Sequence, residues 1–258
     1  MSAIPVRGSP ALKIEAEDGR ALVVADLHLG LEAELSQKGI GLPDQLPKLR
    51  ERLLELLERE KPQRLVFLGD VKHSVPIATW QEWRGLFTLL AELGKLAKIE
   101  IIPGNHDGDI EGMIPPEVKL HDARGIIIGG VGLTHGHAWP SPELLKTKLL
   151  VMAHNHPTVE LKSELGTRVV EPVWLKCKLK PKKLPEELRK VIQGEGPRLL
   201  IMPAFSELVA GAAVNKAIPE ELLGPLFKAG AVDLPGAEVY LLDGTFLGKV
   251  QELTKLRE

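Results

Sequence analysis

The chain has little cysteine, few aromatic side chains, almost no net charge and no long apolar run. Cys177 is the only cysteine among 258 residues, so an intramolecular disulfide is impossible and the disulfide-stapled secreted class is excluded. No window reaches the roughly 18 apolar residues of a membrane span, and the N-terminus lacks a basic start followed by an apolar core. These absences predict a cytoplasmic protein without a membrane segment.

The charge balance and overall composition narrow the class of protein further. A formal net charge of -2 gives no field that would draw a polyanion onto the whole surface, so nucleic-acid contact would require a local patch. Apolar residues make up 44% and charged residues 26%, which is the usual globular mixture. A chain of this length can bury one large core. We therefore expect a single domain over residues 1–258.

The first hundred residues alternate between two kinds of apolar pattern. Short apolar runs that end in polar clusters predict buried strands, and apolar residues at helical spacing predict amphipathic helices between them. The expected strands are 21–25, 65–68 and 99–102, and the expected helices are 43–60 and 79–96. Strands separated by crossover helices pair in parallel, so the fold class is α/β.

After residue 104 strand candidates follow one another with few helices between them, which predicts a second, more mixed sheet. The segment 181–197 is expected to be a loop with a short helix. Asp243-Gly244 predicts a hairpin turn with positive φ at both central residues, and we expect the chain to end in this hairpin. The strand candidates are 125–128, 131–134, 149–153, 168–179, 199–202, 239–242 and 245–250.

Seven of the eight histidines lie in five polar clusters, and each cluster follows an apolar run. Open α/β sheets bind ligands beyond the carboxyl ends of their strands, so the five loops are expected to converge. Taken singly, a Gly-Asp pair is also an ordinary turn and an Asn-His-Asp run is also a helix cap. Their joint occurrence favours a functional site. The clusters are Asp26–His28, Gly69–His73, Gly104–Asp107, His135–His137 and His154–His156.

The residue types in these clusters indicate a metal centre. Imidazole, carboxylate and amide oxygen together coordinate manganese, iron, zinc and similar divalent ions. In extended backbone, residues two apart point the same way, so Asp26 with His28 and His154 with His156 could each hold one ion. The candidates favour two ions that share a carboxylate, although a single-zinc hydrolase would need only three or four of them. The candidate ligands are Asp26, His28, Asp70, Asn105, His135, His154 and His156.

The order of the motifs over residues 21–157 resembles that of the calcineurin-like metallophosphoesterase superfamily. The order is Asp-x-His, Gly-Asp-x-x-His, Gly-Asn-His-Asp, His-Gly-His and His-x-His. The presence of His73, the sequence of 135–140 and the Met-Pro-Ala-Phe-Ser of 202–206 resemble the ICC-like phosphoesterases, which include nuclease-like relatives associated with DNA ligase or replication protein A. Ala153 departs from the glycine usual in the last motif. The resemblance implies a two-sheet β-sandwich flanked by helices.

The resemblance also implies roles for single residues. Asp70 would bridge the two ions. His106 would face the scissile phosphate as general acid or charge stabiliser, and Asp107 would orient it without binding metal. For His73 and His137, three roles stay open: support of the ligands, contact with substrate, or structural partnership. The first ion would be held by Asp26, His28 and His156, and the second by Asn105, His135 and His154.

The implied activity is hydrolysis of a phosphoester by in-line attack of a metal-bridging hydroxide, with manganese as the first choice of metal and iron, zinc, nickel or cobalt as alternatives. A phosphodiesterase acting on nucleotides or single-stranded DNA, with DNA-repair proteins as partners, follows from the resemblance alone. The alternatives are a phosphomonoesterase for a small metabolite and a catalytically silent interaction scaffold.

Two further segments carry open interpretations. Five lysines lie between Trp174 and Lys183 inclusive, and their alternation with apolar residues over 176–180 predicts a strand with one basic face. That face could follow a phosphate backbone, or the lysines could protect an edge strand against aggregation. The small residues of 203–215 would permit close approach to the metal site, or form a tight packing loop.

Overall fold

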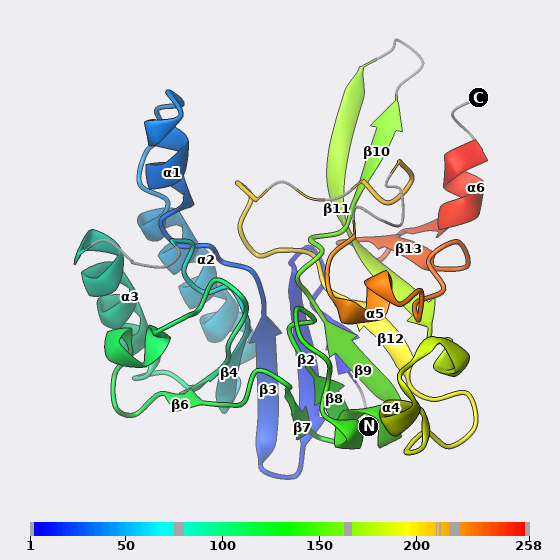
Figure 1. The fold of residues 1–258 in the computed structure, drawn as a ribbon. Helices are drawn as coiled ribbons and strands as arrows, with labels where there is room; N and C mark the ends of the chain where they lie inside the picture. The colour runs from blue at the N-terminus through cyan, green and yellow to red at the C-terminus, as the bar shows by residue number, and fades with distance from the viewer. Residues whose placement is uncertain are drawn as a thin grey trace.

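The structure of the protein is a computed structural model that describes residues 3–74, 80–162, 167–209, 211, 213–216 and 222–255, with side chains from residue 83 onward in the second range. Two β-sheets pack face to face, and helices cover both outer faces (Figure 1). No helix in these ranges is both long enough and apolar enough to cross a bilayer.

The first sheet has the strand order β1-β2-β3-β4-β5-β6. Strands β1 to β3 are antiparallel neighbours, whereas β3 to β6 run parallel. Two crossover helices, α2 (Leu46–Glu60) and α3 (Trp80–Leu93), pack on its outer face. The strands are β1 (Ala3–Pro5), β2 (Ala11–Ala16), β3 (Gly19–Val24), β4 (Arg64–Leu68), β5 (Lys98–Ile102) and β6 (Lys119–Leu120).

The second sheet has the order β14-β13-β11-β12-β9-β8-β7, and β10 pairs with the outer part of β11. Here β8, β9 and β12 are parallel and the other pairs are antiparallel. The strands are β7 (Ile126–Ile128), β8 (Val131–Leu133), β9 (Leu149–Met152), β10 (Thr158–Lys162), β11 (Arg168–Lys178), β12 (Arg198–Ile201), β13 (Glu238–Leu241) and β14 (Phe246–Lys249).

Three apolar layers hold the sheets and helices together. Alternate residues of each strand point to opposite faces, so one strand contributes to two layers. In β4, for example, Val66 lies between the sheets while Phe67 packs under the helices. A third layer covers the outer face of the second sheet. The remaining helices are α1 (Leu31–Gln37), η1 (Ile110–Met113), η2 (Pro142–Lys146), η3 (Pro181–Lys183), α4 (Glu186–Arg189), α5 (Pro225–Lys228) and α6 (Val250–Lys255).

The predicted fold class is confirmed: two mixed sheets flanked by helices, with parallel strands at the predicted apolar runs. The hairpin after β13 is also confirmed, but its predicted turn is wrong because only Gly244 has positive φ, and Asp243 instead accepts a hydrogen bond from the amide of Thr245. The expectation that the chain ends in this hairpin is wrong as well, since α6 follows β14. Part of the expected helix 79–96 lies outside the described residues.

Candidate metal centre

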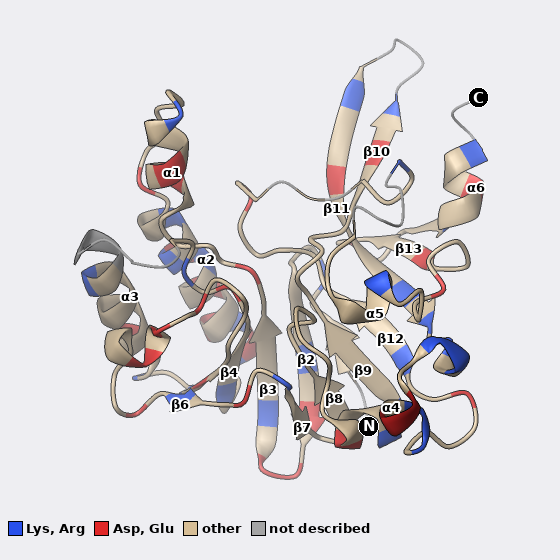
Figure 2. Ribbon diagram, in the orientation of Figure 1, with Lys and Arg blue, Asp and Glu red and all other residues tan. Residues whose placement is uncertain are grey.

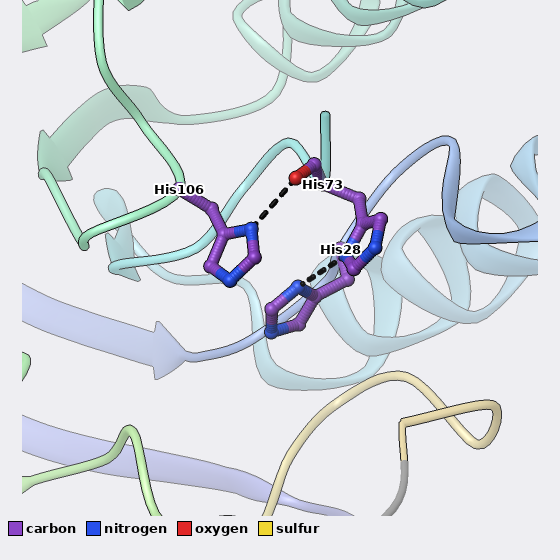
Figure 3. Close-up of side chains that lie close together, drawn as sticks. All are labelled: His28, His73 and His106. Carbon is purple, nitrogen blue, oxygen red and sulfur yellow. Dashed lines mark hydrogen bonds between the residues drawn. The ribbon is translucent and has the colours of Figure 1, made fainter. Parts of the chain in front are cut away.

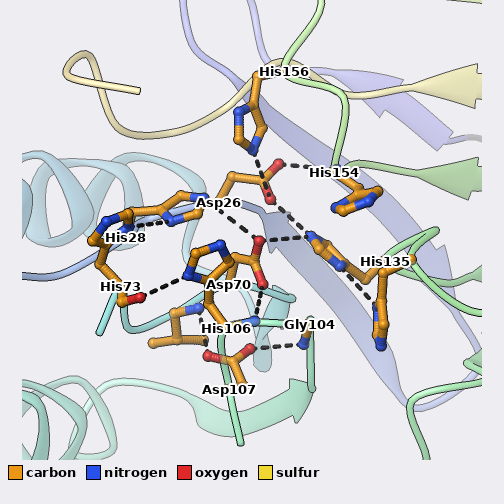
Figure 4. A network of polar contacts seen from close by, with 12 residues as sticks. Asp26, His28, Asp70, His73, Gly104, His106, Asp107, His135, His154 and His156 are labelled. Atoms are coloured by element: carbon orange, nitrogen blue, oxygen red, sulfur yellow. Dashed lines mark hydrogen bonds and ion pairs between the residues drawn. The ribbon is translucent and has the colours of Figure 1, made fainter. Parts of the chain in front are cut away.

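The five predicted clusters meet at one place, at the carboxyl ends of β3, β4, β5, β8 and β9 (Figure 4). The backbone of the first two loops continues the strand pairing, because the amide of Asp26 donates to the carbonyl of Gly69 at 3.0 Å and that of His28 to Asp70 at 2.9 Å. This pairing brings residues far apart in the sequence within contact of one another.

The Asp26 carboxylate is completely buried and faces histidines. Its Oδ1 lies 2.9 Å from His135 Nε2 and 3.3 Å from His156 Nε2, and its Oδ2 lies 3.3 Å from the amide nitrogen of His154. Burial raises the pKa of Asp26, but the histidines His156 and His135 outweigh burial and the net shift is downward. Asp26 is therefore an anionic centre on which three clusters converge.

The Asp70 carboxylate lies between the two halves of the site. Its Oδ2 is 3.5 Å from both His28 Nε2 and His135 Nε2, while its Oδ1 accepts a hydrogen bond from the amide of His106 at 2.9 Å. The side chain is 2% exposed. Two groups of potential ligand atoms, all within 4.8 Å of one another in each group, share this residue. These groups are Asp26, His28, Asp70 and His156, and Asp70, His135 and His154.

Two glycines make room for these side chains. A Cβ on Gly104 would lie 2.5 Å from the amide nitrogen of Asp70 and closer still to its Oδ1. A Cβ on Gly69, which has a φ of +82°, would overlap the ring of His135. The glycines of the Gly-Asp and Gly-Asn-His-Asp motifs thus permit the close approach of the loops.

The ligand pairs converge by a different geometry from the predicted one. Asp26 and His28 were expected to point the same way from extended backbone, but their φ values are 56° and 46°. His154 and His156 have φ values of 70° and 42°. The extended-backbone prediction is wrong because each residue turns into the left-handed region, which Asp and His adopt more readily than most residues. Ala153, where glycine was expected, does not have positive φ and so fits as alanine.

The donor set fits divalent cations. Burial lowers the pKa of His28 to about 3 and that of His154 to about 3, so both rings are neutral and offer a lone pair. In the described part of the chain, the buried Nε2 of His28 has no hydrogen-bond partner although it faces the Asp70 carboxylate. The lone pairs of these two rings lie beside the buried carboxylates of Asp26 and Asp70, and imidazole nitrogen with carboxylate oxygen is a donor set that divalent cations take. The residues present therefore suit a metal centre.

Asn105 is the one candidate ligand with an exposed side chain. It stands between Gly104 and His106 on the loop that follows β5, beside the Asp70 carboxylate. Both neighbours of Asn105 thus approach Asp70, while Asn105 itself is exposed.

His106 and Asp107 have separate contacts. The ring of His106 donates from Nδ1 to the carbonyl oxygen of His73 at 2.6 Å. The buried Asp107 carboxylate instead accepts hydrogen bonds from the amides of Val71 at 2.9 Å and Gly104 at 2.8 Å. Burial raises the pKa of Asp107. Asp107 was expected to orient His106, and its contacts show that it joins the two loops, while the His73 carbonyl holds the His106 ring.

His73 and His137 occupy equivalent positions on the two sides of the site. His73 Nδ1 lies 3.0 Å from His28 Nδ1 (Figure 4). His137 Nδ1 lies 3.1 Å from His135 Nδ1. Burial lowers the pKa of His137. Each therefore touches a candidate ligand on the nitrogen that faces away from Asp70.

Three residues near the site were missed from the sequence. Glu34 Oε2 lies 2.7 Å from His73 Nε2, and the buried Lys72 donates to the carbonyl of His106 at 2.6 Å. Asn155 binds Leu223 in both directions, at 2.7 and 3.1 Å. Lys72 and Asn155 lie inside the clusters that the sequence analysis identified, so their positions could have suggested a role. Nothing in the sequence shows that Lys72 is buried, and buried lysines are rare. Glu34 has no such signal, since its contact spans 39 residues.

A cleft of about 440 Å³ opens over the histidines. Histidines, among them His106 and His156, line it together with leucines, a valine and the charged Glu34 and Lys38. Part of the 203–215 segment lies beside it: the amide of Ser206 donates to the carbonyl of Asp26 at 3.2 Å. Leu208 and Val209 line the cleft, whereas Asn215, at the end of the segment, hydrogen-bonds to the backbone of Glu160 in β10. The apolar residues of the cleft are Leu31, Leu35, Leu208, Val209 and Leu223.

The predicted basic face lies elsewhere. Lys176 and Lys178 are exposed on either side of buried Cys177, as expected. However, β11 hydrogen-bonds with β12 on one side and β13 on the other, so the edge-strand interpretation is wrong for this part of it. Lys178 pairs with Arg198, which begins β12, and β12 runs parallel to β9. By this register Lys178 lies at the end of the sheet opposite the histidine loops, whereas Lys176 pairs with Leu200, nearer the middle of the strands. Figure 2 shows Lys and Arg (blue) spread over both sheets and the helices.

Comparison with known proteins is consistent with this geometry. Residues 19–191 match the Metallophos family, described as calcineurin-like phosphoesterase. The crystal structure of Pseudomonas putida nuclease MPE has a similar fold, with a TM-score of 0.52 and 18% identity over 94% of this chain and 98% of that chain. Yfce, a phosphoesterase from E. coli, matches with a TM-score of 0.40 and 18% identity over 89% of this chain and 97% of that chain.

Proposed function

Because the chain belongs to the calcineurin-like phosphoesterase family, we propose that it is a dinuclear metal-dependent phosphodiesterase that acts on nucleic acid or nucleotides. The observation that carries this proposal is that two groups of ligand atoms share Asp70. A carboxylate common to both groups is what a pair of ions about 3.5–4 Å apart requires.

In this proposal the ligands are divided between two ions as the sequence resemblance implied. Manganese is the metal used in the tests. Bound ions would activate water and neutralise charge on the phosphate oxygens. Asp70 and Asp26 supply the anionic charge that holds them. The first ion is assigned to Asp26, His28 and His156, and the second to His135 and His154, with Asp70 between them. Asn105 is added to the second ion as a neutral oxygen ligand on the strength of the sequence resemblance.

His106 is assigned to the phosphate side of the cleft. Its Nδ1–H is committed to the His73 carbonyl, which leaves Nε2 as the atom available to substrate. In the imidazolium form Nε2 can donate a proton to the leaving oxygen, a contribution on the order of 10²–10⁴ in rate. Asp107 keeps the loop that carries His106 against the loop that carries Asp70, so it acts as a positioning residue.

The choice of a nucleic-acid or nucleotide diester is supported by the apolar residues of the cleft. Leucine and valine side chains beside the histidines suit a substrate in which a charged phosphate is joined to a flat, apolar nucleobase. Pseudomonas putida MPE is described as a nuclease. A DNA-repair setting and membership of the ICC-like subgroup remain predictions from the sequence motifs.

The test is a comparison of Asp70→Asn and His106→Ala with the parent after manganese loading. Asp70→Asn keeps the shape of the side chain and removes the shared negative charge, so we expect kcat/KM to fall by at least about 10²-fold together with manganese content. His106→Ala should lose about 10²–10⁴ in kcat while it keeps its manganese. Full metal-dependent activity in the Asp70 variant would reject the shared-ligand assignment.

Substrate class is tested with the parent enzyme on a small monoester, a small diester, nucleotides and single-stranded DNA under one manganese concentration. We expect the diesters to be hydrolysed with the higher kcat/KM. A monoester preferred by tenfold or more would instead establish the phosphomonoesterase alternative, and no hydrolysis of any substrate by metal-loaded protein would favour the scaffold.

A further inference from the structure

Glu34, His73 and His28 form a continuous chain of contacts that ends in the metal centre. Glu34 lies on α1, outside the sequence motifs, and its Oε2 is 2.7 Å from His73 Nε2. His73 Nδ1 is 3.0 Å from His28 Nδ1 (Figure 3). His28 Nε2 faces Asp70 Oδ2 at 3.5 Å. Both nitrogens of both rings therefore have a defined neighbour.

The direction of the hydrogen bonds follows from the carboxylate. Hydrogen bonds from Lys38 and His73 lower the pKa of Glu34 to about 2, so this side chain is ionised and can only accept. His73 must then carry its proton on Nε2, and in the neutral ring Nδ1 is an acceptor. His28 must donate from Nδ1, which leaves the lone pair of His28 on Nε2. One carboxylate thus fixes two tautomers in sequence.

From this geometry we propose that Glu34 is a positioning residue that, through His73, fixes His28 in the tautomer that presents its Nε2 lone pair to the metal centre. The inference rests on the proposed function only in naming His28 as a metal ligand. Carboxylates that orient metal-binding imidazoles are a general device, but here a second imidazole lies between the two.

His73 links this chain to His106 as well. Its carbonyl accepts the hydrogen bond from His106 Nδ1, and the two rings stack with centroids 5.0 Å apart and planes 18° apart. His73 therefore orients a ligand with its ring and the proposed phosphate-facing residue with its backbone. Loss of the Glu34 contact frees the ring of His73 while the carbonyl stays in the backbone of the loop.

A different reading of the same rings is a third cation. His28, His73 and His106 place nitrogens within 4.8 Å of one another, and an N–N separation of 3.0 Å also suits two ligands of one ion. The fixed tautomer of His28 is favoured over a third cation, because His73 and His106 already have hydrogen-bond partners in Glu34 and the His73 carbonyl. The number of bound ions separates the two readings.

The first experiment reads the tautomers directly in metal-free full-length protein. Long-range ¹H–¹⁵N spectra of the imidazoles, assigned with His28→Asn and His73→Asn variants, should show His28 protonated on Nδ1 and His73 protonated on Nε2. In Glu34→Gln the amide can donate or accept, so both rings should become tautomeric mixtures. His28 protonated on Nε2 in the parent would overturn the proposal, whether or not the protein hydrolyses phosphoesters.

The second experiment measures manganese affinity by the electron paramagnetic resonance signal of free Mn²⁺. Glu34→Ala should weaken one site by about 10-fold, the lower end of the range for residues that support a ligand. Lys38→Gln is the matched control, since Lys38 binds the same carboxylate without touching His73, and its affinity should equal that of the parent. Unchanged affinity in Glu34→Ala, or three ions per parent chain that fall to two in His73→Asn, would refute the proposal.

Discussion

Replacing Gly104 with alanine tests whether the loop after β5 has to approach Asp70 as closely as the structure shows. The added Cβ would lie 2.8 Å from Asp70 Cγ and 2.5 Å from its amide nitrogen. Ordinary carbon contacts begin at about 3.5 Å. The Asp70 carboxylate, or the loop that carries His106, must therefore move by roughly 0.7 Å or more.

A displacement of this size is large for a metal ligand, because coordination distances tolerate about 0.2 Å. A misplacement of about 1 Å can cost on the order of 10²-fold in rate. We expect kcat/KM for a small diester to fall by about 10²-fold, which corresponds to about 2.7 kcal/mol of transition-state stabilisation. Overpacking of this kind should also lower the free energy of unfolding, by roughly 1–3 kcal/mol.

Gly108→Ala is the matched control in the same loop. No atom lies within 4 Å of the position that its Cβ would occupy, and neither Gly104 nor Gly108 has positive φ. Both variants therefore add one methyl group to backbone that tolerates alanine, and only Gly104→Ala meets Asp70. Steady-state hydrolysis and urea unfolding are measured for both. A folded Gly104→Ala enzyme within threefold of the parent, or an equal loss in Gly108→Ala, would refute the steric argument.

Two further predictions concern metal removal and the distant lysines. Chelation should lower Tm by about 5–10 °C without changing the far-ultraviolet circular dichroism. The reason is that an ion present at 100 times its Kd stabilises the fold by about 2.7 kcal/mol, and each kcal/mol shifts Tm by about 2–4 °C. An unchanged Tm on removal of bound metal would contradict this. Replacing Lys176 and Lys178 with glutamine should leave hydrolysis of a small diester and of single-stranded DNA unchanged, since Lys178 lies at the end of the sheet opposite the histidine loops and Lys176, on the same strand, is separated from β9 by β12. A loss confined to DNA would show that the substrate reaches them.

The sequence predicted those elements whose apolar pattern is strong. The runs that became β3, β4 and β5 are buried almost throughout, so their existence and parallel pairing followed from apolar composition and the helices between them. Helix α1 escaped prediction because none of its residues is buried, which leaves no apolar periodicity to detect. Its Glu34 is nevertheless the residue that reaches His73.

The candidate ligands could be recognised from residue type and position after strands, but the contacts that orient them could not. Asp107 was assigned to His106 as its neighbour in the chain, whereas its carboxylate accepts from Val71, 36 residues away. Likewise, Asn155 binds Leu223 across 68 residues. Such contacts depend on how two loops lie in space, and neither periodicity nor spacing in one chain encodes that arrangement.

Backbone conformation is the other feature that the sequence did not disclose, and it explains how the site is held. Among the residues that the structure describes, seven non-glycine residues have positive φ, and five of these are proposed metal ligands. At about 1 kcal/mol each, these conformations cost on the order of 5 kcal/mol, against a total stability of about 5–15 kcal/mol. The five are Asp26, His28, Asp70, His154 and His156.

Such conformations persist only where surrounding contacts determine them. The hydrogen bonds from Asp26 to Gly69 and from His28 to Asp70 extend the pairing of β3 and β4 past the strand ends. These bonds do not involve a cation, so the ligand loops keep their left-handed turns when metal is removed. Metal binding then adds to the stability of a site that the backbone has already formed, and chelation is expected to change Tm and activity while the secondary structure stays intact.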